Sequence, residues 1–315
     1  MTIAIDRRRW LHTILLAFGA GKTGGQLLAV DYDKPVPGSE NLTALQSNGL
    51  VLFRWNNRTL GTYRAHSSQK YPYFYPLVGP ASGRSLVAES ALPYPHHRGL
   101  WLGCEPLNGG DYWGDTSLDR GQIRSAQLRL GEETPQSGGF TDHTEWIRKN
   151  AASPLEEARR FAVHVSDDRL WCLDCDIVLT AREEISIGRA KHSFFAVRVI
   201  PELTPPYGGV LMNSEGGTGA EGTYSKPARW CGYHGQTAPG VVEGLAIMDH
   251  PENPWDSCPW FTRDYGHLSP SPFEFLGKPW VLSKGKSIRL RYRVVIYAGT
   301  PQQAGLDALY SKWIA

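Results

Sequence analysis

The stretch Ile288-Arg289-Leu290-Arg291-Tyr292-Arg293-Val294 alternates apolar and basic side chains along its whole length. Successive side chains of a β-strand point to opposite faces, so the pattern predicts a strand with one buried and one solvated face. Strands that bury only one face are typical of antiparallel sheets. Residues 287–298 are therefore expected to form a long antiparallel strand, and this expectation sets the fold class as all-β.

The remainder of the chain supports a single large β-sandwich. Short apolar runs between turn residues predict strands at residues 50–55, 59–64, 122–130, 140–149, 158–165, 170–181, 194–200 and 244–249. Residues 302–314 instead show helical spacing, which predicts a short C-terminal helix packed on the body. No 20–50-residue repeat and no linker after residue 40 interrupts the pattern, so residues 31–315 are expected to be one antiparallel β-sandwich domain with long loops.

Composition excludes several classes of partner. The 33 basic and 31 acidic residues give a formal charge of +2, so no global field favours nucleic acid. No run of about eighteen apolar residues exists, so no transmembrane segment is expected. The 11 Trp and 14 Tyr can stack on sugar rings, but such residues are equally common in cores and strands.

Residues 1–30 are predicted to be an export signal and lead-in. Arg7-Arg8-Arg9 precedes an aromatic residue and an apolar run through residues 13–20, which resembles a twin-arginine signal. This predicts a periplasmic or secreted bacterial protein. The alternative is the basic N-terminus of a cytoplasmic protein.

Only two of the five cysteines, Cys172 and Cys175, are close in sequence. On the strand predicted there, positions three apart face opposite sides of the sheet, which disfavours a zinc knuckle. Buried free thiols are the simplest interpretation, and one disulfide stays open as an alternative.

The longest segments without predicted strands are residues 71–119, 205–237 and 250–275, and they contain most of the His, Trp and Asn-Gly sequences. Loops of this length inside a domain are usually functional. A site built by loops at one face or rim of the sandwich is therefore expected.

Four long blocks within these loops resemble the PmoA-like family of bacterial proteins, often labelled "methane oxygenase PmoA". They are YPYFYPLVGPASG (71–83), PHHRGLWLGCEPLNGGDYWGD (95–115), MNSEGGTGAEGTYSKPARWCGYHG (212–235) and LAIMDHPENPWDSCPWFTRDYGHLSPSPF (245–273). The resemblance implies a galactose-mutarotase-like β-sandwich and a role in carbohydrate catabolism. It does not imply methane oxidation, because a methane monooxygenase subunit of that kind needs membrane segments. Relatives tend to carry an acidic pair before the strand near residue 195, where this chain has GRAKHS (188–193).

Two adjacent histidines, His96 and His97, are the leading candidates for catalysis. They lie in a Pro-His-His-Arg-Gly turn, where neighbouring side chains could both reach a concave site. A histidine titrates near neutrality and can act as general acid or base on a sugar hydroxyl, while Arg98 could hold an oxygen through its planar fork. The structural alternative is that both histidines bond to loop backbone and that Arg98 pairs with Asp111 or Asp115.

A third histidine, His250, follows a predicted strand and is expected to join the pair, and His143 is expected to face the same cavity. Together, His96, His97 and His250 could hold Zn²⁺ or Mn²⁺, although their spacing matches no compact ligand motif, so a divalent metal is possible and no cofactor is certain. Glu215, which is followed by Gly216 and Gly217, is the candidate second carboxylate, or else a surface turn residue.

The expected sugar-binding surface combines aromatic faces with polar side chains that address hydroxyl groups. Its predicted members are Arg98, Asp111, Trp113, His143, Asn213, Trp260, Arg263 and Tyr265. The alternative is an aromatic core beneath a long loop.

These residues favour an exported carbohydrate-active enzyme that performs histidine-mediated acid/base chemistry, as epimerisation, β-elimination or hydrolysis, on a sugar or keto-sugar. A non-catalytic carbohydrate-binding sandwich and a structural exported β-protein are the alternatives. Convergence of His96, His97 and His250 on one open cavity would favour the enzyme.

Overall fold

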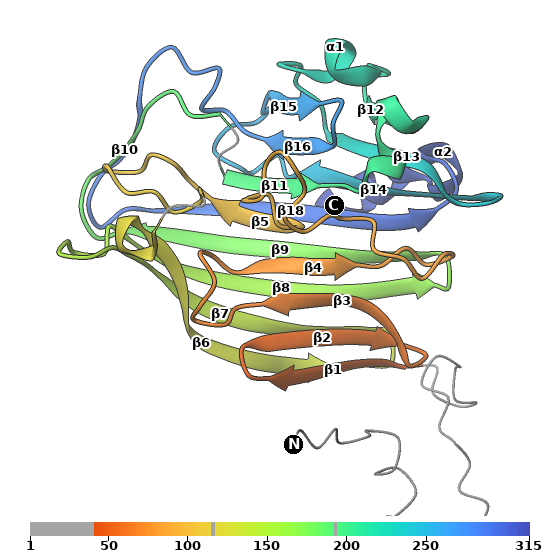
Figure 1. Cartoon of the computed structure of the whole chain (residues 1–315), viewed down its shortest axis with the longest axis horizontal. Helices are drawn as coiled ribbons and strands as arrows, with labels where there is room; N and C mark the ends of the chain where they lie inside the picture. The colour runs from red at the N-terminus through yellow and green to blue at the C-terminus, as the bar shows by residue number, and fades with distance from the viewer. Residues whose placement is uncertain (1–40, 115–116, 192–193) are drawn as a thin grey trace, which may run out of the picture. The chain divides into compact units, whose positions relative to one another are not determined.

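The computed structural model describes residues 41–114, 117–191 and 194–315, all of which fall within one compact unit. Their strands form two eight-stranded antiparallel sheets and a separate two-stranded ribbon (Figure 1). The all-β sandwich expected from the alternating strand at 287–298 is therefore confirmed. The predicted export signal at residues 1–30 lies outside the described residues.

The first sheet contains the strands that later position the site. Its order is β1 (Leu42–Ser47), β2 (Leu50–Trp55), β3 (Arg58–Arg64), β4 (Tyr73–Leu77), β5 (Leu100–Gly103), β11 (Phe194–Arg198), β16 (His267–Pro270) and β15 (Trp260–Arg263). The strands β5, β11 and β16 are buried at every residue. Loops must therefore cover the face of these strands that points away from the second sheet.

The second sheet is built mainly from long strands with alternating burial. Its order is β12 (Val210–Asn213), β13 (Trp230–Ala238), β14 (Val241–Asp249), β18 (Ser287–Ala298), β9 (Leu170–Ala181), β8 (Leu155–Asp167), β7 (Ser137–Ile147) and β6 (Gln122–Glu133). β18 pairs with β9 without a register shift from Ser287↔Thr180 to Tyr297↔Leu170, so the residues of the two strands that face the core lie opposite one another. The ribbon joins β10 (Ile185–Ile187) to β17 (Trp280–Leu282).

Aromatic side chains fill the space between the two sheets. Tyr63 and Phe74 of the first sheet contact Phe140 and Phe161 of the second, with ring centroids 4.8 to 6.2 Å apart. This core also contains a buried ion pair, Arg159–Glu157, whose atoms approach to 2.7 Å. Buried charges persist only where they are paired, which this pair satisfies.

The predicted C-terminal helix is broken into two. α2 (Pro301–Ala304) ends and α3 (Leu306–Ile314) begins at Gly305, which adopts φ +66, a left-handed conformation that glycine tolerates best. α3 packs Leu306 and Tyr310 against the outer side of the second sheet in a small separate core. The remaining short elements are α1 (Gly219–Thr223) and 3-10 turns at Leu118–Arg120, Pro201–Leu203 and Pro205–Tyr207.

All five cysteines are buried and free. Cys172 belongs to the small core beneath α3 and Cys175 to the main core, so the two side chains face opposite sides of β9 as the strand pattern predicts. Within the described residues, no helix is long and apolar enough to cross a membrane.

Candidate functional site

The site lies on the outer face of the first sheet, the face that points away from the second sheet. Phe195 stacks on Tyr292 of β18 at 4.4 Å between ring centroids, so alternate residues of β11 point outward. The register pairs Ala196 with Trp101 and Arg198 with His267. Residues paired across a sheet share a face, so Trp101, Arg198 and His267 lie together on the outer side.

The Pro-His-His-Arg-Gly turn is bonded directly to this face. The Gly99 N–H donates to Ala88 O (2.8 Å), and the Arg198 N–H donates to Gly99 O (2.8 Å). Gly99 has φ +60, and a Cβ there would lie 2.0 Å from the carbonyl oxygen of Phe74. Only glycine fits this close approach, and the turn therefore carries the preceding histidines over β5 and β11.

The histidines lie in an aromatic cluster. The His96 ring contacts Trp113 at 4.6 Å and the His97 ring at 4.8 Å. His97 is 1% exposed and lies 5.5 Å from Trp101 and 4.9 Å from His267, whereas His96 is only half-buried. His96 is therefore the histidine placed to meet a ligand, and His97 packs beneath it.

An Asx turn positions Trp113. Asp111 Oδ1 accepts hydrogen bonds from the backbone N–H groups of Trp113 (3.0 Å) and Gly114 (2.7 Å). A Cβ at Gly114 would lie 3.0 Å from both Asp111 Oδ2 and Glu105 Oε2, so glycine leaves the space in which these two carboxylates approach each other. The turn thus presents the indole of Trp113 next to Glu105.

Trp113 lines a cavity of about 460 Å³, called the Trp113 cavity below. Its lining residues are Glu105, Trp113, Arg189, Ala190, Lys191 and Glu274. Trp113 is 5% exposed, so the accessible lining is mostly polar, and a cavity of this size suits a small polar ligand.

The two carboxylates of the cavity differ in environment. Glu274, with 4% of its side chain exposed, accepts from Arg189 Nη2 (3.0 Å) and Nε (3.3 Å), which makes a bidentate ion pair. Partial burial, followed by the nearby charge of Asp111, raises the pKa of the Glu105 carboxyl group above its ordinary value. The Glu105 carboxyl group can therefore serve as a proton donor beside the Arg189–Glu274 ion pair.

The structure brings four of the sequence-predicted residues together: His96, His97, Trp113 and Tyr265. Tyr265 lies 6.4 Å from His97, and Asp111 supports the cluster through its turn. Arg98 points elsewhere, since its Nη1 donates to Gln69 Oε1 (2.9 Å). Asp115, one of the two acidic partners that the structural alternative gave to Arg98, lies outside the described residues.

His250 and His143 do not join this cluster, and the expectation that they share its cavity is wrong. His250 follows β14 of the second sheet and packs on Trp313 of α3, 4.9 Å between rings. His143 is exposed on β7 because its neighbours Asp142 and Thr144 occupy the inward positions of that strand.

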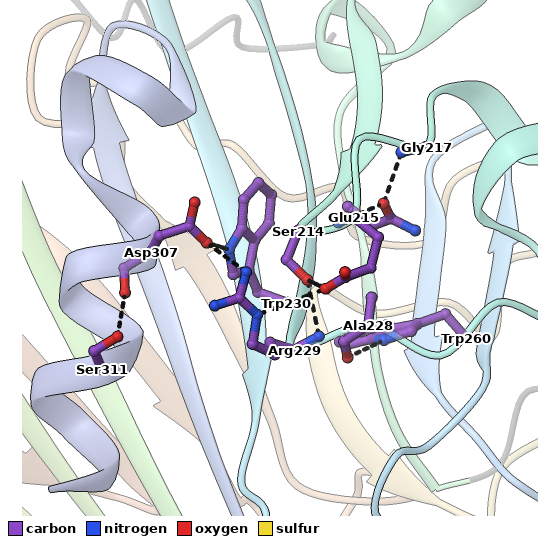
Figure 2. Close-up of polar contacts among 10 residues, drawn as sticks. Ser214, Glu215, Gly217, Ala228, Arg229, Trp230, Trp260, Asp307 and Ser311 are labelled. Carbon is purple, nitrogen blue, oxygen red and sulfur yellow. Dashed lines mark hydrogen bonds and ion pairs between the residues drawn. The ribbon is translucent and has the colours of Figure 1, made fainter.

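Glu215 is a surface residue rather than a partner of the histidines (Figure 2). Its Oε1 accepts from Ser214 Oγ (2.8 Å) and lies 3.6 Å from Arg229 Nε, and 57% of its side chain is exposed. Asn213 is buried and shapes the same turn, since its Oδ1 accepts from the N–H groups of Glu215 and Gly217.

The predicted sugar platform at Trp260 and Arg263 is mostly structural. Trp260 is fully buried and donates from Nε1 to Ala228 O (2.9 Å). The Arg263 guanidinium lies over the rings of Phe261 (4.1 Å) and Tyr224 (4.5 Å). The alternative interpretation, an aromatic core beneath a long loop, therefore describes these two residues.

The prediction that His96, His97 and His250 together hold a metal ion is wrong, because His250 follows a strand of the second sheet. Across the described ranges 41–114, 117–191 and 194–315, no group of three or more His, Cys, Asp or Glu side chains could hold a metal ion.

Sequence reasoning missed most of the residues that line the site. Glu105, Arg189, Lys191 and Glu274 come from three separate loops, and no local pattern links them. The unusual basic segment at 188–191, noted where relatives carry acids, was the one available signal. Trp101, Arg198 and His267 were missed because β5, β11 and β16 are buried on both faces and show no alternation.

The fold and site define a β-sandwich protein with a loop-covered, aromatic and polar ligand cavity. The sequence matches the family of unknown function DUF6807 over residues 43–311, and the chain belongs to that family. The family's description names no activity. No curated protein is significantly similar to the chain in sequence.

The solved structures that the chain is similar to are distant. An α-galactosidase from Lactobacillus brevis is 9% identical with a TM-score of 0.38, over 84% of this chain and 40% of that one. A galactose mutarotase related enzyme from Lactobacillus acidophilus is 9% identical with a TM-score of 0.30, over 82% of this chain and 97% of that one. A polysaccharide lyase is 10% identical with a TM-score of 0.29, over 82% of this chain and 33% of that one. The chain thus spans well under half of the α-galactosidase and of the lyase, and similarity at this level assigns no activity.

Proposed function

We propose that the protein is an exported carbohydrate-active enzyme that performs acid/base chemistry on a sugar or keto-sugar in the Trp113 cavity. The observation that supports this most is the arrangement of Trp113 beside Glu105. Trp113, although only 5% exposed, contributes an apolar part of the cavity wall, and a carboxyl group whose pKa is raised is a better proton donor to a sugar oxygen than an ordinary glutamate.

The roles of the other residues follow from their exposure and contacts. His96 is not among the described residues that line the cavity, but it is half-buried and contacts Trp113, which does line it, and in this proposal it takes or returns the second proton of the reaction. Glu274, neutralised by Arg189, supplies hydrogen-bond acceptors for hydroxyl groups. His97 holds the aromatic cluster together, because a side chain that is 1% exposed does not meet the ligand directly.

Epimerisation, β-elimination and hydrolysis all need a proton donor and a proton acceptor at the sugar, and this pair supports each of them. In a keto-sugar, the proton next to the carbonyl group is acidic enough for a histidine base. Export is part of the proposal and rests on residues 1–30, outside the described residues; cell fractionation tests it.

A non-catalytic carbohydrate-binding sandwich is the second candidate. One observation favours it: His96 is not among the described residues that line the cavity, and Arg189 engages both oxygens of Glu274, so neither is positioned in the cavity as a free base. In that case the same cavity would bind sugar without turning it over.

Incubation with a panel of glycosides and 3-keto-glycosides, with and without chelator, followed by mass spectrometry, tests the enzyme. Wild type is expected to convert at least one member. Glu105→Gln, which cannot give a proton, is expected to lose most of the turnover, about 100-fold or more, while retaining binding. Glu215→Gln is the matched control, an exposed glutamate elsewhere, and should convert the substrate at the wild-type rate. Sugar binding without turnover by wild type would favour the binding protein, and equal turnover by both variants would refute the role of Glu105.

A further inference from the structure

Arg198, at the end of β11, is a buried cation without an acidic partner. The residue is 6% exposed, and its Nε and Nη1 atoms have no hydrogen-bond partner among the described residues. Its neighbours are aromatic. The guanidinium lies 4.4 Å from the ring centroid of Tyr265, and Tyr94 and Tyr233 are close enough to influence its pKa. Burial lowers the pKa of the guanidinium, although arginine stays protonated.

A second unused donor lies on the same face. The Nε1 atom of Trp101, which is 2% exposed, also has no hydrogen-bond partner in the described part of the chain. Trp101 pairs with Ala196, two residues from Arg198, so the two side chains are diagonal neighbours on the outer face. Diagonal neighbours on a sheet are within reach of one another when their side chains are long.

Both groups can only donate, and a buried donor without an acceptor is costly to the fold. An anion that accepts from both would offset this cost. Arg198 contributes one positive charge. Across the sheet, Arg198 pairs with His267 and His267 pairs with Arg263. The Arg263 guanidinium already lies over the rings of Phe261 and Tyr224. One unmatched charge fits a singly charged planar carboxylate better than a doubly charged phosphate group.

We propose that Arg198, with Trp101, binds the carboxylate of a sugar acid, so that the substrate class is a uronate or a related acidic sugar. This inference rests on the proposed function. His97 links the two regions, since its ring lies 5.5 Å from both Trp101 and Trp113. Tyr265 covers the Arg198 guanidinium (4.4 Å), and Tyr94, 37% exposed, packs on Tyr265 (5.2 Å between ring centroids), so carboxylate binding requires these two rings to move aside.

Isothermal titration of the full chain with D-glucuronate, D-galacturonate, D-glucose, D-galactose and glucose 6-phosphate tests this assignment. Wild type is expected to bind a uronate at least about tenfold more tightly than the matching neutral sugar, because a hydrogen bond to a charged group contributes that much. Arg198→Met is expected to lose this difference, and Arg198→Lys, which keeps the charge without the planar fork, to retain part of it.

Thermal unfolding separates a ligand-binding arginine from a structural one. Arg293 is the control, because it is also largely covered, with 16% of its side chain exposed, but pairs with Asp174 through Nε (2.6 Å) and Nη2 (2.7 Å). Arg293→Met leaves Asp174 unpaired and should lower the melting temperature clearly. Arg198→Met removes a cation without a counter-charge and should melt within about 2 °C of wild type.

Three results would overturn the inference: equal affinity for uronates and neutral sugars, preference for the sugar phosphate, or a fall in melting temperature for Arg198→Met as large as for Arg293→Met. Each leaves the proposed function intact if neutral sugars are still converted and Glu105→Gln is still inactive. Loss of the Glu105 effect would instead refute the proposed function, whatever Arg198 binds.

Discussion

The corner that follows β14 offers a sharp prediction, because it contains a carboxyl group that the fold holds in its neutral form. Asp249 is 5% exposed and its Oδ1 accepts from Asn253 Nδ2 (2.7 Å). Burial, and then the charge of Asp256, raises the pKa of Asp249 from 3.8 to about 7. In the unfolded chain this carboxyl group regains its ordinary pKa, so folding and protonation are linked.

Replacing Asp249 with Asn keeps the shape and the hydrogen bond from Asn253 but removes the titration. A rise from 3.8 to about 7, at about 1.4 kcal/mol for each tenfold change in acid dissociation, corresponds to about 4 kcal/mol. The sign follows from proton binding: between the two pKa values the folded state holds a proton that the unfolded state has lost, so wild-type stability falls as the pH rises. The stabilising contribution is complete below pH 3.8 and is lost above pH 7.

Urea denaturation of wild type and Asp249→Asn at pH 4 and at pH 8 measures this difference. The two proteins should be similar at pH 4, and the variant should be more stable at pH 8 by up to about 4 kcal/mol. Sugar turnover should be unaffected, because this corner lies on the second sheet, away from the Trp113 cavity. Parallel stability curves, with the variant offset equally at both pH values, would refute the reasoning.

Two further predictions concern the cavity wall and the core. Trp113→Leu should lower the free energy of unfolding by about 2 kcal/mol, because the indole is 5% exposed and packs against His96, His97 and Trp101; urea denaturation checks this, and unchanged stability would contradict it. Arg159→Met should lower the free energy of unfolding by about 3–5 kcal/mol, because it leaves Glu157, with none of its side chain exposed, as an unpaired buried charge. The exposed neighbour Arg160→Met should change stability by less than about 0.5 kcal/mol, and equal losses in urea denaturation would contradict the role of the buried pair.

The strands that sequence reasoning found and those it missed differ in one physical respect. Residues 50–55, 170–181 and 287–298 were predicted with the bounds that β2, β9 and β18 have, since each forms part of a sheet with one more polar face. By contrast, β5 and β16 are four residues each and buried throughout, so they resemble loop sequence. The segments 71–119 and 250–275, predicted to be long loops, therefore contain two of the strands on which the candidate site lies.

The candidate site shows a similar division. His96, His97 and Trp113 are close in sequence, so their association could be predicted from one stretch. Glu274 and Arg189 meet only because two distant loops lie over the same end of the sheet, and a single sequence contains no signal for that contact. His250 was misplaced because the end of a strand does not reveal which sheet the strand belongs to.

The central claim is that sugar chemistry takes place between Trp113 and Glu105. A crystal structure of Glu105→Gln with the substrate found in the glycoside panel tests it most directly, since the variant binds without turnover. The account predicts a sugar bound in the Trp113 cavity, with a ring or glycosidic oxygen within about 3.2 Å of the residue 105 side chain. A sugar bound at the Glu215 surface turn, or bound with residue 105 facing solvent, would contradict it.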